Sequence, residues 1–285
     1  MSFPATSDSP LGDGTRAAYE QLAEWLVARH RNDGLRIVGI NGAQGSGKST
    51  LAAFLVGHLA AHHGLRGIAV SLDDFYLGRA ARSELAAKVH PLFITRGVPG
   101  THDVQRGIAC LRALREIKPG EACALPRFSK ATDEALGPEH DHLVSEAPDL
   151  VLFEGWCVGT PPQEPAALAT PVNALERDED PDGSWRRHVN AQLAGPYAEW
   201  FAQLDALVHL QVPGWAQVRQ WRAQQERETA AANAGRSVLL DAGAQQRFLQ
   251  HYQRLTDHAA QSLPARAAVT LRLGADHAVA ASHYR

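Results

Sequence analysis

Cysteines and long apolar runs, either of which would place the chain in a special class of protein, are scarce in its sequence. There are 3 cysteines among 285 residues, Cys110, Cys123 and Cys157, and none belongs to a C-x-x-C pair. An odd number of cysteines, with no basic and apolar leader before them, predicts reduced thiols in a cytoplasmic protein. Apolar runs are also short, well below the roughly 20 residues of a membrane-spanning helix, so we expect no membrane partner.

The chain also lacks an excess of either charge. Lys and Arg number 28 and Asp and Glu number 31, which gives a formal net charge of −3. Proteins that bind nucleic acid usually carry a basic face, so nucleic acid is not an expected partner. A hydrophobic content of 45% is enough for a sizeable core. The sequence leaves the oligomeric state open.

Short apolar strands alternate with helical patterns along most of the chain. This alternation predicts an α/β fold with a parallel sheet and helices on both faces. Residues 1–14 are rich in Ser, Pro, Gly and Asp and are predicted to form a flexible tail, with one domain over 15–285. Strands are expected at 36–40, 67–72, 149–155, 207–212 and 269–273, and helices at 17–28, 51–59, 185–204, 215–232 and 245–255.

A glycine-rich segment, "GAQGSGKST", fits the pattern G-x-x-x-x-G-K-[ST] and lies between an expected strand and an expected helix. Such a loop points its backbone N–H groups at phosphate oxygens, and the dipole of the following helix adds to the attraction. Lys48 is predicted to reach the β- and γ-phosphates of ATP, and the Ser49 hydroxyl to ligate Mg²⁺. A plain glycine-rich turn is the weaker alternative. The predicted nucleotide-binding residues are Gly42, Ala43, Gln44, Gly45, Ser46, Gly47, Lys48, Ser49 and Thr50.

Two missing motifs narrow the class of nucleotide protein. A GTPase would carry [NT]-K-x-D to read the base, and the nearest segment, "SKATD" at 129–133, has the wrong spacing. A transporter-type ATPase would carry a segment like L-S-G-G-Q, which the sequence does not contain. Both absences favour a small-molecule kinase.

Carboxylates follow two of the expected strands. Asp73 and Asp74 come after the strand at 67–72, and Glu154 ends the strand at 149–155. Ligands of open α/β sheets bind at such strand ends, and phosphoryl transfer needs carboxylates for a metal and for the hydroxyl proton. Because side chains alternate along a strand, only one of the two aspartates can face the acceptor hydroxyl as the base, and the other can join Glu154 and Ser49 around Mg²⁺. Which aspartate takes which role stays open at this point, as does a simple turn.

Two further segments carry weaker signals. In the loop 96–103, Arg96 is a candidate for binding an acceptor carboxylate and His102 for binding a hydroxyl, although the loop also fits a plain helix cap. Arg222 lies on the expected helix 215–232, where it is either part of a lid over the phosphates or the partner of Glu226 in a surface ion pair.

Several motifs together resemble one family. The segments "GAQGSGKST", "SLDDFYL", "RGVPGTHD", "PRFSKATDE" and "LFEGWCVG" are similar to the D-glycerate 3-kinase family, within the group that includes phosphoribulokinase, uridine kinase and pantothenate kinase. The resemblance runs from about residue 37 to the C-terminus. It implies a P-loop kinase fold with a five-stranded parallel sheet. It also implies ATP and Mg²⁺ as cofactors, and transfer of the γ-phosphate to D-glycerate or a close small hydroxy acid.

The resemblance also implies roles for individual residues. Pro126, Phe128, Ser129 and Lys130 match the family's P-x-[YF]-[DS]-K-like segment, with Arg127 between them, whereas the continuation "ATDEALGPEHDH" departs from the family pattern. The acceptor therefore stays open between a hydroxy acid and another small metabolite such as a polyol, vitamin precursor or nucleoside. A regulatory protein that hydrolyses ATP is a further alternative. The implied catalytic residues are Lys48, Asp73, Glu154 and Arg222, the metal ligands Ser49, Asp74 and Glu154, and the substrate-binding residues Asp74, Tyr76, Arg96, His102 and Lys130.

Overall fold

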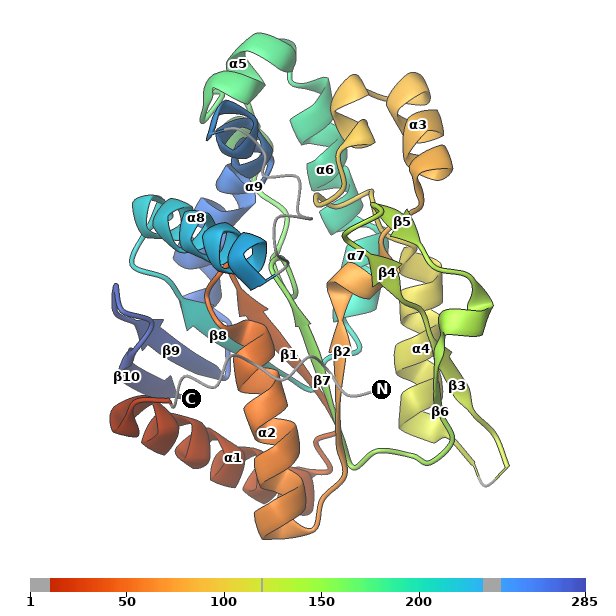
Figure 1. Cartoon of the computed structure of the whole chain (residues 1–285), viewed down its shortest axis with the longest axis vertical. Coiled ribbons are helices and arrows are strands. Elements are labelled where there is room, and N and C mark those ends of the chain that lie inside the picture. The colour runs from red at the N-terminus through yellow and green to blue at the C-terminus, as the bar shows by residue number, and fades with distance from the viewer. Residues whose placement is uncertain (1–10, 119, 233–241) are drawn as a thin grey trace.

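A six-stranded sheet runs through the computed structural model, which describes residues 11–118, 120–232 and 242–285 (Figure 1). Its strands are β1 (Ile37–Gly42), β2 (Gly67–Ser71), β7 (Leu150–Gly155), β8 (Ala206–Gln211), β9 (Val269–Leu273) and β10 (Val279–Tyr284). The strand order is β10-β9-β8-β1-β7-β2. The five strands from β9 to β2 are parallel, as predicted, and β10 adds an antiparallel sixth strand at the edge.

Helices cover both faces of this sheet, and two small hairpin-like pairs lie beyond its β2 edge (Figure 1). The helices are α1 (Asp13–Asp33), α2 (Lys48–His63), α3 (Arg79–Lys88), α4 (Val104–Glu116), α5 (Ala174–Glu179), α6 (Ser184–Ala194), α7 (Pro196–Phe201), α8 (Trp215–Ala232) and α9 (Ala242–Ser262). The small pairs are β3 (Cys123–Leu125) with β6 (His142–Val144), and β4 (Phe128–Ser129) with β5 (Glu134–Ala135).

Side-chain alternation along the central strands builds two hydrophobic cores. Val38 and Ile40 of β1 face α1, α2 and α8 on one side of the sheet. Ile37 of β1 and Phe153 of β7 face α4, α6, α7 and α9 on the other side. Strands β1 and β7 are buried along their whole length and are apolar except near their carboxyl ends, where Asn41 and Glu154 lie. Within the described ranges, no helix has the length and apolar character needed to cross a bilayer.

The structure corrects three predicted boundaries. Helix α1 begins at Asp13, inside the predicted tail, while residues 1–10 lie outside the described residues. The helix expected at 185–204 is divided into α6 and α7, because Pro196 lacks the N–H that would continue α6 and instead begins a new helix. Strand β2 ends at Ser71, and a 3₁₀ helix, Leu72–Phe75, carries the two aspartates.

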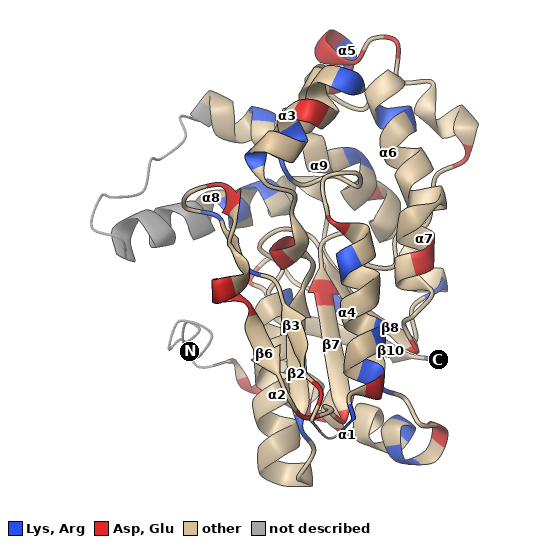
Figure 2. Ribbon diagram, turned by 90° about the vertical axis from the view of Figure 1, so that its right-hand side faces the viewer, with Lys and Arg blue, Asp and Glu red and all other residues tan. Residues whose placement is uncertain are grey.

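The carboxyl ends of the parallel strands meet at one edge of the sheet, at the top of β1 and β7 in Figure 1. The loop between β1 and α2, the 3₁₀ helix after β2 and the acidic end of β7 all lie there (Figures 1 and 2). In Figure 2 the acidic and basic positions are interspersed over the helices, in agreement with the nearly balanced charge of the chain.

Candidate active site

The glycine-rich loop has the predicted position between β1 and α2. The backbone of Gly45 and of Gly47 is left-handed, with φ of 76° and 83°, a conformation that glycine adopts without strain. The Ser46 N–H donates to the Ala43 carbonyl at 3.1 Å, which closes the curl of the loop. Helix α2 then begins at Lys48. Its N-terminus therefore follows the loop directly, as a phosphate-binding loop requires.

A second layer of residues supports this loop from outside. The His277 Nε2 atom lies 2.9 Å from the Gly45 carbonyl oxygen, and the His277 ring stacks on Trp221 of α8 with centroids 4.1 Å apart. A Cβ on Gly45 would lie 3.0 Å from the Trp221 Cβ and 3.6 Å from the Arg222 nitrogen. Helix α8 therefore passes directly beside the loop. Sequence reasoning missed His277, since a lone histidine in a turn gives no signal.

A serine and a glutamate from distant parts of the chain meet behind the loop. The Ser49 hydroxyl donates to Glu154 Oε1 at 2.9 Å, and Glu154 is 6% exposed. The register of β7 places Glu154 between Ile40 of β1 and Ser71 of β2. The other carboxylate oxygen, Oε2, is buried and has no hydrogen-bond partner among the described residues. A hydroxyl and an unsatisfied carboxylate oxygen are the donor types that Mg²⁺ prefers, so the pair fits this ion.

Asp73 lies between two lysines from different elements. Lys130, which follows β4, places its Nζ atom 2.5 Å from the Asp73 Oδ2 atom. Burial acts to raise the pKa of Asp73, but the charges of Lys130 and Lys48 outweigh it and hold the pKa well below its usual range. Asp73 is therefore ionised at neutral pH, and it is paired with Lys130 in the segment after β4.

Asp74, its neighbour, has different surroundings. Its carboxylate accepts from Arg127 at 3.2 Å and from the Phe128 backbone N–H at 3.3 Å. Burial raises the pKa of Asp74, and the charge of Arg127 opposes this shift. Of the three predicted metal ligands, the structure brings Ser49 and Glu154 into contact, whereas Asp74 contacts the segment that leads into β4.

The β4–β5 hairpin is anchored through Asp133, which sequence reasoning missed. Arg82 of α3 is 2% exposed and donates to Asp133 Oδ2 at 2.8 Å, to the Leu77 carbonyl at 3.0 Å and to the Ile94 carbonyl at 2.7 Å. The Arg96 guanidinium also pairs with Asp133. The predicted carboxylate-binding group of Arg96 is thus already engaged in this anchor. A buried arginine on a polar helix has no local sequence signature.

His102 and Tyr76 form a stacked pair next to Asp73. Their ring centroids are 4.4 Å apart, and a single backbone bridge joins the two residues. The His102 Nδ1 atom lies 2.5 Å from the Tyr197 hydroxyl, while its Nε2 atom is buried without a hydrogen-bond partner in the described part of the chain. Burial lowers the pKa of His102 to about 3, against the charge of Asp73, so the ring is neutral at physiological pH.

Comparison with known proteins agrees with this geometry, although no family model matches the chain. The chain is 36% identical over 199 residues to the uncharacterized kinase mug58 of Schizosaccharomyces pombe, which covers 67% of this chain and 69% of that protein. Its fold is similar to that of D-glycerate 3-kinase from Cryptococcus neoformans var. grubii, with a TM-score of 0.79, 25% identity and coverage of 94% of this chain and 99% of that one.

A structure described as a possible uridine kinase from Bacillus stearothermophilus is similar in fold alone. The TM-score is 0.51 at 19% identity, over 90% of this chain and 97% of that chain. The fold, the phosphate-binding loop and these relatives define a P-loop kinase that acts on a small metabolite. Within that class, the chain belongs to the D-glycerate 3-kinase family, as its motifs predicted.

Proposed function

We propose that the protein transfers the γ-phosphate of ATP to a hydroxyl group of D-glycerate or a close small hydroxy acid. The observation that carries this proposal is the position of the ionised Asp73 carboxylate. Its pKa is lowered by the positive charges of Lys130 after β4 and of Lys48 in the phosphate-binding loop. A base between a phosphate-binding lysine and a second cation suits transfer to the hydroxyl of an anionic acceptor.

Each residue of the site then has a defined task. Lys48 and the loop amides bind the phosphates and stabilise the charge that moves during transfer. Ser49 and Glu154 would hold Mg²⁺, which neutralises charge on the β- and γ-phosphates when it is bound. Asp73 accepts the proton of the attacking hydroxyl. Arg222 of α8, whose backbone lies beside Gly45, serves as the lid arginine over the phosphates.

The surroundings of Asp73 support an acceptor that carries a carboxylate. Lys130 is 62% exposed in its side chain, so it is accessible to a small anion as well as to Asp73. The neutral His102 ring lies beside Asp73 with its buried Nε2 atom unpaired among the described residues, and Tyr76 fixes that ring by stacking. All three cysteines are free and buried, in keeping with the reducing cytoplasm that we propose as the compartment.

An ADP-release screen tests the proposal. The full-length protein is assayed with Mg²⁺ and ATP against D-glycerate, L-glycerate, polyols, pantothenate and nucleosides, with a no-acceptor control. We expect D-glycerate or a close hydroxy acid to raise ADP release far above the control. Stimulation by a nucleoside or polyol alone would overturn the acceptor assignment. Equal release without any acceptor would instead favour an ATP-hydrolysing regulatory protein.

A variant of the phosphate-binding loop controls for contaminating kinases. Lys48→Ala should abolish acceptor-dependent turnover and leave the fold intact, because Lys48 supplies charge to phosphates rather than packing to the core. Circular dichroism and thermal unfolding confirm the fold. A folded Lys48→Ala protein with near wild-type turnover would contradict the assignment of the loop.

A further inference from the structure

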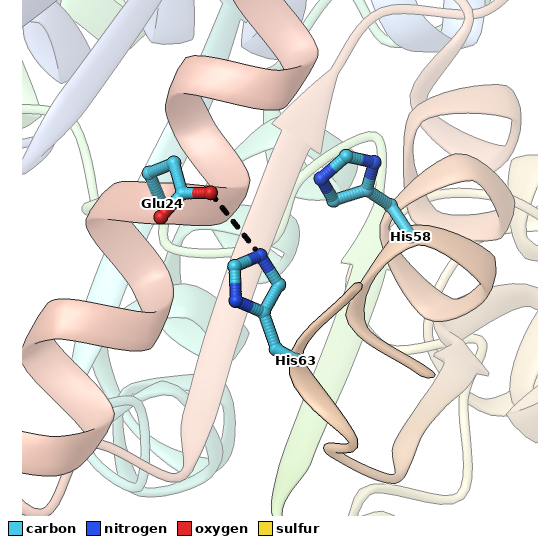
Figure 3. A group of neighbouring side chains, drawn as sticks. All are labelled: Glu24, His58 and His63. Carbon is cyan, nitrogen blue, oxygen red and sulfur yellow. Dashed lines mark ion pairs between the residues drawn. The ribbon is translucent and has the colours of Figure 1, made fainter. Parts of the chain in front are cut away.

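Three potential metal ligands converge far from the active site, in the space between α1 and α2. Glu24 extends from α1, and His58 and His63 extend from the last turns of α2 (Figure 3). One ligand atom from each lies within 4.8 Å of the other two. We propose that these side chains form a binding site for a divalent transition metal, above all Zn²⁺, with water as the fourth ligand.

The spacing of the ligand atoms suits a tetrahedral ion. Bonds of about 2.0–2.1 Å to nitrogen and oxygen place two ligands of tetrahedral Zn²⁺ about 3.3 Å apart. The Glu24 Oε1 atom lies 3.2 Å from the His63 Nε2 atom, which is close to that separation. Glu24 is 67% exposed in its side chain, so it has the rotamer freedom to complete the geometry with His58.

The state of His63 also points to a missing ligand. Its side chain is 11% exposed, and its Nε2 atom is buried. Although Glu24 Oε1 is near, the contact does not have hydrogen-bond geometry, and Nε2 has no hydrogen-bond partner within the described residues. A buried imidazole nitrogen without a partner is costly, and coordination to a metal would satisfy it.

The charges around the site favour a soft divalent cation. His63 ends α2, and the negative end of the helix dipole there attracts cations. His58 lies one to two turns before His63 on the same helix, so both imidazoles lie near this negative end. Two imidazoles and one carboxylate suit Zn²⁺ and disfavour Mg²⁺, which binds oxygen ligands.

The site would act on the fold rather than on the phosphates. Lys48 and Ser49 lie in the first turn of α2, whereas His63 is the last of its 16 residues, roughly 22 Å away at the rise of an α-helix. A metal held by Glu24 and His63 would tie α1 to the far end of the helix that begins the phosphate-binding site. The proposal is therefore independent of the acceptor.

Cobalt titration of the full-length, metal-free protein tests the site. Millimolar Mg²⁺ is kept present to occupy oxygen-rich sites, and Co²⁺ is followed by its visible absorption, which is intense in tetrahedral coordination. We expect one equivalent of Co²⁺ to give this spectrum and Zn²⁺ to displace it. Zn²⁺ should also raise the midpoint of thermal unfolding. Absence of the tetrahedral spectrum at saturating Co²⁺, with enough protein for this absorption to be measurable, would overturn the proposal.

Variants assign the ligands. Glu24→Gln, His58→Ala and His63→Ala should each weaken Co²⁺ binding at least tenfold and remove the thermal shift caused by Zn²⁺. His62→Ala is the matched control, because His62 is exposed and stacks on His58 at 4.3 Å but lies outside the ligand set. If a histidine variant does not fold, the effect of the exposed Glu24→Gln change on Co²⁺ binding tests the site by itself. Equal binding by Glu24→Gln and wild type, or equal loss in His62→Ala, would contradict the site.

Discussion

At the scale of single residues, the two adjacent aspartates have opposite electrostatic surroundings. Lysines hold the pKa of Asp73 well below its usual range, while burial raises the pKa of Asp74. Alternation along a strand does not explain this difference, because both residues lie in the 3₁₀ helix that follows β2. Their side chains diverge within this turn, so that Asp73 meets Lys130 and Asp74 meets Arg127.

Asp73→Asn should reduce turnover by roughly 10² to 10⁴, because the amide cannot accept the hydroxyl proton. The Michaelis constant for ATP should change little, since the phosphate-binding loop is intact. Steady-state kinetics at saturating ATP, Mg²⁺ and acceptor measure the effect. A variant that retains more than a tenth of the wild-type turnover would exclude Asp73 as the base.

Asp74→Asn should raise the Michaelis constant for the acceptor several-fold and lower turnover less than Asp73→Asn. The asparagine can still accept from the Phe128 N–H, but it loses the charge that holds Arg127. The same assay is repeated over a range of Mg²⁺ concentrations. Recovery of activity at high Mg²⁺ would instead support the metal-ligand role that the sequence predicted for Asp74.

At the scale of elements, Asp133 links the β4–β5 hairpin to the buried Arg82 of α3. Asp133→Asn should destabilise the protein by about 1–3 kcal/mol, since the buried Arg82 loses its carboxylate partner. Lys130 lies between the two strands of this hairpin, so the Michaelis constant for the acceptor should rise more than the Michaelis constant for ATP. Urea unfolding and kinetics check both effects. A loss of stability without any change in the Michaelis constant for the acceptor would show that the hairpin does not contribute to acceptor binding.

Helix α8 is the second element with a functional prediction. Arg222→Ala should lower turnover more than it weakens ATP binding, because a lid arginine acts on charge that develops during transfer. Turnover and nucleotide affinity, measured separately, test this difference. The side chain of Glu226 lies outside the described residues. Glu226→Gln is the matched control, because it removes the other charge of the alternative surface pair. Equal small effects of both changes would favour the surface-pair interpretation.

At the scale of the whole molecule, Asp205 joins the sheet to its helical cover. Its carboxylate accepts from the backbone N–H groups of Arg36 at 2.8 Å and Ile37 at 2.7 Å, and from Arg115 of α4 at 2.9 Å. Burial acts to raise the pKa of Asp205, but these donors outweigh it and lower the pKa. The folded state therefore binds this proton less readily than the unfolded state does.

The resulting contribution to stability should be present above about pH 4, the ordinary pKa of an aspartate, and should fade as the pH falls below it. Asp205→Asn should cost about 1–3 kcal/mol in the free energy of unfolding at pH 7 and flatten the acid dependence. Urea unfolding at pH 7 and at pH 3.5 measures both. Asp33→Asn is the control, because its pair with Arg29 is about half exposed. An unchanged acid dependence in Asp205→Asn would exclude this linkage.

Local patterns in the sequence determined much of this protein. The five parallel strands were predictable because each is a short apolar run between helices, and β10 was not, because its exposed residues lack that pattern. The phosphate-binding loop was predictable because glycine spacing, lysine and serine act within nine consecutive residues. Even the carboxylates at the strand ends followed from the position of each strand alone.

Tertiary structure alone decided which of these groups meet. Ser49 and Glu154 are 105 residues apart in sequence, and Asp73 and Lys130 are 57 apart. The first contact depends on β7 lying next to β1, and the second on a hairpin anchored by Arg82 through Asp133. Glu24 and His63 likewise meet only because α1 and α2 pack on the same face of the sheet. Such contacts follow from the order of strands and the packing of helices, which no local pattern records.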